Sequence, residues 1–157
     1  MSYPNKFSQG NRDNQPPRVN EALKKFRDNI STKAFTHNDI LGLNEELGKS
    51  FAGRDDTITQ VNKFYNLVRV AESQSAQNEE LAKIQVKLHV LKAQIAYATA
   101  RETLSKDFKE FFDISITKIL KSNNLTEMKE SLKAFTTFFE SVYAYFYYHT
   151  KANKGGY

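Results

Sequence analysis

The chain has 157 residues, a formal net charge of +5 and no cysteine. The absence of cysteine excludes a disulfide framework, a thiolate metal site and a cysteine nucleophile. A chain of this length is typical of one domain, and it can bury about two thirds of its unfolded surface without a metal or a disulfide.

The first 18 residues contain all three prolines and are rich in Asn, Gln and Ser. We therefore expect residues 1–18 to form a disordered tail and residues 19–157 to form a single helical domain. The N-terminus lacks an apolar segment, and no run elsewhere approaches the roughly 20 apolar residues that a membrane span needs. The sequence thus predicts a soluble, cytoplasmic protein with no secretory signal and no membrane partner.

The first expected helix covers residues 19–30. Its apolar residues recur at helical spacing: Val19, Leu23, Phe26 and Ile30. The stretch 36–52 is less regular, because Thr36 and Asp39 can form a capping box while Gly42 and Gly48 lower the helix propensity. We expect a short helix there, which the glycines can break.

Periodicity is strong from Asp56 onward, and Asp56 or Thr57 can cap the helix that follows. Apolar residues three and four apart mark three helices, over 58–71, from 81 to about 103, and over 106–121. Their predicted buried residues are Ile58, Val61, Phe64, Tyr65, Val68 and Ala71, then Leu81, Ile84, Leu88, Leu91, Ile95 and Ala98, then Phe108, Phe112, Ile116 and Leu120.

The last helix begins after Asn124, which offers a second capping box with Glu127. Its apolar stripe consists of Leu125, Met128, Leu132, Phe135, Phe139, Val142 and Phe146. Gly155 and Gly156 follow as stop signals. Since no segment alternates with period two, the sequence predicts an all-α fold, a compact bundle of about five helices.

The segment FFESVYAYFYYHTK, residues 138–151, carries seven aromatic rings among fourteen residues. Phe135, Phe139 and Phe146 lie on the apolar stripe, which Phe138 and Tyr145 widen, so a buried core is the favoured interpretation. Tyr143, Tyr147 and Tyr148 fall partly outside the stripe and are candidates for a partner surface. A platform for base stacking is the third alternative, although few cations lie nearby.

Nothing in the sequence indicates catalysis, a metal or a cofactor. The three histidines lie far apart, and no Gly-rich loop of the phosphate-binding kind precedes a helix. Helix capping explains the pair Asp55–Asp56 more simply than a catalytic dyad does. Glu140 is an unusual acid in an aromatic helix and, if buried, would need a partner.

Two polar faces are more informative. The first lies opposite the apolar stripe of helix 58–71 and consists of Thr59, Asn62, Lys63, Asn66 and Arg69, with no acid before Glu72. The second consists of Lys83, Lys87, Gln94 and Arg101. Such donor-rich faces suit contacts with phosphates and sugars, which position a nucleic acid without reading its sequence. A solvated face of no further function is the alternative.

Three blocks occur in series: TITQVNKFYNLV (57–68), LKAQIAYATAR (91–101) and KAFTTFFESVYAY (133–145), before a terminal Lys and Gly-Gly. This pattern resembles the small subunit of type III-A CRISPR effector (Csm) complexes. The resemblance implies a non-catalytic helical subunit that helps to hold the duplex of guide RNA and target RNA. It also implies backbone and large subunits as partners, and copies of the chain stacked head to tail. The surplus tyrosines and the acidic region 36–80 are candidate contacts for such stacking.

Four residues on or beside these blocks are the predicted RNA-backbone contacts, and Lys87 is a weaker candidate. The four are Arg54, Lys63, Arg69 and Arg101, of which Lys63 and Arg69 are expected to share one helix face. Arg101 has an alternative role, the neutralisation of a buried acid such as Glu140.

Three other classes of function compete with this interpretation. A helical protein–protein adaptor would use the same bundle without binding nucleic acid. A helix-turn-helix regulator would need a short turn before a recognition helix, whereas residues 73–80 form a polar connector and an apolar helix follows. An enzyme is disfavoured because the sequence offers no nucleophile with a neighbouring base.

Overall fold

The computed structural model describes residues 19–53, 56–77 and 79–153. These residues form helices and no strand, so the all-α prediction is confirmed. The helices are α1 (Glu21–Ile30), α2 (Asn38–Leu41), α3 (Asn44–Ala52), α4 (Ile58–Ser75), α5 (Leu81–Ala100), α6 (Lys106–Leu120) and α7 (Leu125–Asn153). The predicted tail over 1–18 and the stop signals at Gly155 and Gly156 lie outside the described residues.

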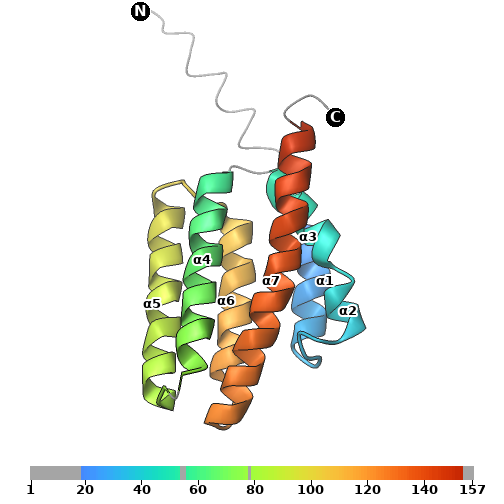
Figure 1. Cartoon of the computed structure of the whole chain (residues 1–157). Helices are drawn as coiled ribbons and strands as arrows, with labels where there is room; N and C mark the ends of the chain where they lie inside the picture. Colours follow the sequence, from blue (N-terminus) through green and yellow to red (C-terminus); the bar gives the residue numbers. More distant parts are fainter. Residues whose placement is uncertain (1–18, 54–55, 78, 154–157) are drawn as a thin grey trace, which may run out of the picture.

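The four long helices α4 to α7 stand side by side, and α1 to α3 lie on the other side of α7 from α4 (Figure 1). Helix α4 packs between α5 and α7, while α6 contacts α1, α5 and α7. The described helices number seven rather than about five. One reason is that the stretch 36–52 is divided between α2, which is a single turn, and α3, as the glycines in that stretch suggested.

Helix α1 begins at Glu21, two residues later than expected. The Asn20 side chain caps it, because its Oδ1 accepts a hydrogen bond from the Leu23 N–H at 3.0 Å. Asparagine is among the strongest N-cap residues, and Asn20 has the extended backbone that is usual at this position. Val19 therefore lies outside the helix with 67 % of its surface exposed, and its predicted place in the core is wrong.

The capping box predicted at Thr36 and Asp39 does not form. The His37 ring caps α2 instead, since its Nδ1 accepts a hydrogen bond from the Asp39 N–H at 3.0 Å. The Asp39 carboxylate pairs with the Lys33 ammonium, which holds the pKa of Asp39 below its ordinary value. Asp39 therefore pairs with Lys33, six residues earlier in the chain, and does not form a capping box with Thr36.

Thr57, and not Asp56, caps α4: the Thr57 hydroxyl oxygen accepts a hydrogen bond from the Gln60 N–H at 3.2 Å. The buried Asp56 carboxylate instead accepts hydrogen bonds from the Ser105 N–H at 2.7 Å and from the Ser105 hydroxyl at 2.6 Å. Ser105 is itself the N-cap of α6. Asp56 therefore fastens the start of α4 to the start of α6. The neighbouring Asp55 lies outside the described residues.

The boundaries of α5 and α7 agree with the sequence only in part. Helix α5 ends at Ala100, three residues earlier than expected, where Glu102 takes a positive φ of 62°. At the start of α7, Asn124 Oδ1 accepts from the Glu127 N–H at 2.9 Å, as the capping box predicts. The Glu127 carboxylate completes the box on the Asn123 N–H, at 2.9 Å.

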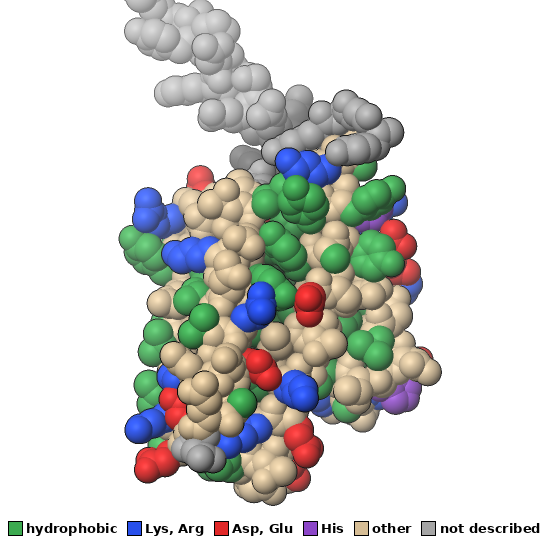
Figure 2. All heavy atoms as spheres, in the orientation of Figure 1, with side chains coloured by type: hydrophobic (Ala, Val, Ile, Leu, Met, Phe, Trp, Pro, Cys, Tyr) green, Lys and Arg blue, Asp and Glu red, His purple; other side chains and the backbone are tan. Residues whose placement is uncertain are grey.

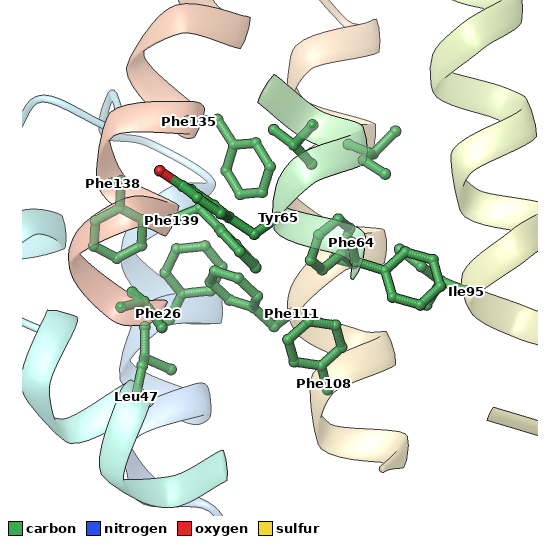
Figure 3. Packing of buried hydrophobic residues seen from close by; sticks show 14 of the residues in the cluster. Phe26, Leu47, Phe64, Tyr65, Ile95, Phe108, Phe111, Phe135, Phe138 and Phe139 are labelled. Carbon is green, nitrogen blue, oxygen red and sulfur yellow. The ribbon is translucent and has the colours of Figure 1, made fainter. Parts of the chain in front are cut away.

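All phenylalanines of the described residues are buried, and they form most of the core. Phe111 of α6 lies near the centre, with its ring centroid 5.1 Å from that of Phe26 and 5.9 Å from that of Phe139 (Figure 3). The core interpretation of the aromatic segment is thus confirmed for Phe135, Phe138, Phe139 and Phe146. Tyr147 and Tyr148, by contrast, are 45 % and 60 % exposed.

Gly48 explains how closely α3 approaches α7. A Cβ atom at this position would lie 2.6 Å from the backbone nitrogen of Phe146 and 2.6 Å from the backbone oxygen of Val142. Real Cβ atoms essentially never make contacts under 3.0 Å, so only glycine fits here. The glycine that lowers the helix propensity of α3 is therefore the residue that lets the helix pack.

Candidate nucleic-acid interface

The predicted polar face of α4 is exposed along its whole length, including Lys63 and Arg69. These two residues do not, however, share one surface. At 3.6 residues per turn, positions six apart differ by about a third of a turn around the helix. Lys63 faces α5, whereas Arg69 lies on the side of α7, beside Tyr65. The prediction of a single shared face is wrong in this respect.

A groove of about 510 Å³ runs between α4 and α5 and brings Lys63 and Arg101 together. Its other lining residues are Gln60, Val90, Ala93, Gln94, Tyr97, Ala98 and Thr103. No acidic side chain is among the described residues that line it. In the view of Figure 2, hydrophobic side chains gather along the α5 edge, with Lys and Arg side chains towards both of its ends. We call this feature the α4–α5 groove.

Arg101 is the C-cap residue of α5, where the negative end of the helix dipole favours a cation. Its guanidinium carbon lies 5.5 Å from the Tyr97 ring centroid, and Nη1 lies 3.5 Å from the Tyr97 hydroxyl oxygen. The alternative partner, Glu140, is exposed and lies on the other side of α4, beside Tyr65. Glu140 is thus not the buried acid that this alternative required.

Arg69 belongs to a second aromatic cluster, between α4 and α7. Its guanidinium carbon lies 5.7 Å from the Tyr65 ring centroid, and Tyr65 stacks on Tyr143 with centroids 5.1 Å apart. Burial raises the pKa of Tyr65, and the Glu140 carboxylate that accepts its hydrogen bond raises it further. The Tyr143 hydroxyl donates to Asn62 Oδ1 at 3.2 Å. Glu140 beside Tyr65 makes this surface less suited to a polyanion than the α4–α5 groove.

Lys87 is engaged by other side chains of the same chain. Its ammonium group pairs with the Glu79 carboxylate and donates to Gln74 Oε1 at 2.6 Å, so its charge is largely compensated. Arg54, the remaining candidate, lies outside the described residues. Of the five predicted contacts, the fold thus brings Lys63 and Arg101 into one groove and separates Arg69 and Lys87 from them.

Sequence reasoning gave no role to several lining residues of this groove, among them Gln60 and Tyr97. Tyr97 lies in the block that carries the resemblance, but its position had received no role. A signal was present, because Tyr97 is out of phase with the buried residues Leu91, Ile95 and Ala98 and lies one turn before Arg101. An aromatic residue on the polar side of a helix beside an arginine is a candidate for binding.

The rest of the described surface offers less. A larger cavity of about 860 Å³ lies between α1, α6 and α7, but cations and acids mix along its wall. Within the ranges that the structure describes, no three His, Asp or Glu side chains are placed to hold a metal ion. None of the helices described combines the length and the apolar character that a membrane crossing requires.

Comparison with known proteins gives one result. A protein-family model described as Csm2 Type III-A matches residues 34–152, a stretch that contains the α4–α5 groove and all of α2 to α6. No curated protein and no solved structure matches the chain.

Proposed function

The chain belongs to the Csm2 family of type III-A CRISPR effector subunits, because the family match covers well over half of it, and we propose that it is a non-catalytic subunit that holds RNA through the α4–α5 groove. The family membership confirms the resemblance drawn from the three sequence blocks. The RNA contact itself rests on the groove.

The observation that carries the proposal is the pairing of Lys63 and Arg101 across a groove whose described lining has no acid. Two cations without a compensating carboxylate attract a polyanion and release its counterions when they bind it. The amide side chains of Gln60 and Gln94 add donors and acceptors for sugar hydroxyls and phosphate oxygens.

Contacts of this kind suit an RNA-guided complex. Base pairing between the guide RNA and the target RNA reads the sequence, so a protein subunit needs only contacts with the sugar–phosphate backbone. The lysine and the arginine supply charge, and the arginine can also donate two parallel hydrogen bonds to one phosphate. Affinity should then depend on salt and be similar for unrelated RNA sequences.

The remaining partners and the location are part of the same proposal. We expect the chain to contact the backbone and large subunits of the complex and further copies of itself, in the cytoplasm. The exposed Tyr147 and Tyr148 of α7 offer amphipathic rings for protein contacts. Asp39 on α2 is paired with Lys33, so it offers less free charge than the sequence suggested, and Glu45 on α3 lies 3.1 Å from His149 Nε2.

Binding of target RNA by the assembled effector complex tests the proposal. We compare the wild type with Lys63→Gln, Arg101→Gln and the double variant across a salt series. Each lost phosphate contact should weaken binding to unrelated RNA sequences alike and reduce the salt slope by roughly one unit or a little less. Lys24→Gln is the matched control, because Lys24 is an exposed cation on α1, a helix that does not line the groove.

The same experiment separates the competing functions. An unchanged affinity and salt slope in the double variant would remove the groove from the RNA path. That result would favour the function of a protein–protein adaptor. Val86 and Val90 of α5 are 61 % and 49 % exposed and can pack against a protein. A loss restricted to one RNA sequence would indicate base readout, which the proposal excludes.

A further inference from the structure

Tyr97 is the most exposed aromatic ring of the described residues, at 64 %. It lies on α5, with Ala93 one turn before it and Ala100 after it. The ring is therefore not part of the core. Its surroundings indicate what can cover it.

One cation already lies over this ring. The Arg101 guanidinium carbon is 5.5 Å from the Tyr97 centroid, so a planar cation and a planar ring lie in cation–π contact beside the groove. Unpaired RNA bases stack on aromatic rings, tyrosine among them, and on arginine planes. Both are present here within one helical turn.

The floor beside the ring is apolar and small. Val90 and Ala93, which lies one turn before Tyr97, also line the groove, and the Ala93 side chain adds little bulk beside the tyrosine. Across the groove, Lys63 supplies a positive charge and Gln60 an amide. The volume of about 510 Å³ falls in the range of small-molecule sites, which pair an apolar surface with a few placed polar groups.

From this arrangement we propose that the α4–α5 groove takes a single unpaired nucleotide, whose base stacks on Tyr97 and whose phosphate contacts Lys63 and Arg101. The inference rests on the proposed RNA contact of the same groove and adds the form of the ligand. A base inside a duplex is stacked on its neighbours and cannot reach a tyrosine, so the ligand is a single-stranded nucleotide. The charge of the groove favours this ligand over an apolar protein segment.

The test uses the full chain and two probes of the same sequence: a short single-stranded oligoribonucleotide containing one 2-aminopurine, and the blunt duplex that it forms with its complement. Affinity and the quenching of 2-aminopurine fluorescence are measured at low salt for the wild type, Tyr97→Leu and Tyr97→Phe. Tyr148→Leu, which changes an equally exposed tyrosine on α7, is the control. Melting curves check that each variant is folded.

The proposal predicts that Tyr97→Leu loses about five-fold or more in affinity for the single strand, and loses the quenching. Its affinity for the duplex stays within about two-fold of the wild type, and Tyr97→Phe behaves as the wild type does. Equal loss on both probes, no loss on either, or a wild-type chain that does not bind the single strand would each overturn the proposal.

The two claims fail separately. The proposed function fails when Lys63→Gln with Arg101→Gln leaves RNA binding by the assembled complex unchanged. The nucleotide site fails when Tyr97→Leu does not distinguish single strand from duplex, even if the two cations prove essential.

Discussion

Replacement of Gly48 by alanine is a sharp test of the packing, because it reverses the usual effect of this substitution. In the interior of an exposed helix, Gly→Ala stabilises by about 1 kcal/mol. At position 48 the new methyl group would lie 2.6 Å from backbone atoms of Phe146 and Val142. Since backbone atoms cannot rotate away, the two helices must separate.

The size of the effect follows from that separation. Ordinary van der Waals contact begins at 3.4 Å, so α3 and α7 must move apart by about 0.8 Å. Such a gap removes about a quarter to a half of the dispersion energy of each contact along the interface. Overpacking typically costs about 1–3 kcal/mol, and a clash with backbone belongs at the upper end. After the gain in helix propensity, we expect Gly48→Ala to destabilise the chain by about 2 kcal/mol.

Urea unfolding followed by circular dichroism at 222 nm measures this difference. Gly53→Ala is the matched control, because the nearest atom to a Cβ there is the Ser50 oxygen at 3.8 Å, an ordinary contact. We expect Gly53→Ala to change the free energy of unfolding by less than about 0.5 kcal/mol. A Gly48→Ala variant as stable as the wild type, or more stable, would refute the close approach of α3 and α7.

Three further predictions address the core, one buried acid and the tyrosines. Phe139→Ala should destabilise by about 3–5 kcal/mol, whereas Tyr148→Ala should cost little, and thermal melts that give the reverse order would contradict the burial. Asp56→Ala should cost about 2 kcal/mol in urea unfolding, since two Ser105 donors lose a charged acceptor; an unchanged midpoint would argue against this contact. In an absorbance titration, Tyr65 and Tyr143 should ionise above the ordinary pKa of 10.0, because burial raises the pKa of both. The stability that they contribute is complete below pH 10 and is lost above it, and phenylalanine at either position should remove one late-titrating group.

Much of the fold could be predicted from the sequence, because the burial of α4 to α7 follows a three-four repeat. The clearest case is the apolar stripe predicted from Leu125 to Phe146. Its residues from Met128 onward are all buried. Local signals were weaker where a distant residue competes. Aspartate is a residue type that often caps helices. The Asp56 carboxylate instead accepts hydrogen bonds from Ser105, 49 positions away. No local pattern reveals such a partner.

The candidate site was predictable in its residue types and less so in its geometry. The donor-rich face of α4 was visible in the sequence, and its residues are exposed. The helical period alone places Lys63 and Arg69 about a third of a turn apart, and helix packing decides which neighbour each residue faces. Glu79, which pairs with Lys87, lies in the connector before α5, where periodicity gives no information. The groove therefore emerged only when α4 and α5 were placed beside each other.

The central claim is that RNA lies in the α4–α5 groove, and photochemical cross-linking tests it most directly. The effector complex is assembled with RNA that carries 4-thiouridine, irradiated, and digested, and the cross-linked peptides of this chain are identified by mass spectrometry. The account predicts cross-links in α4 around Lys63 and in α5 between Val90 and Arg101, at several positions along the RNA. Cross-links confined to α1 to α3, or none on this chain while other subunits are labelled, would contradict it.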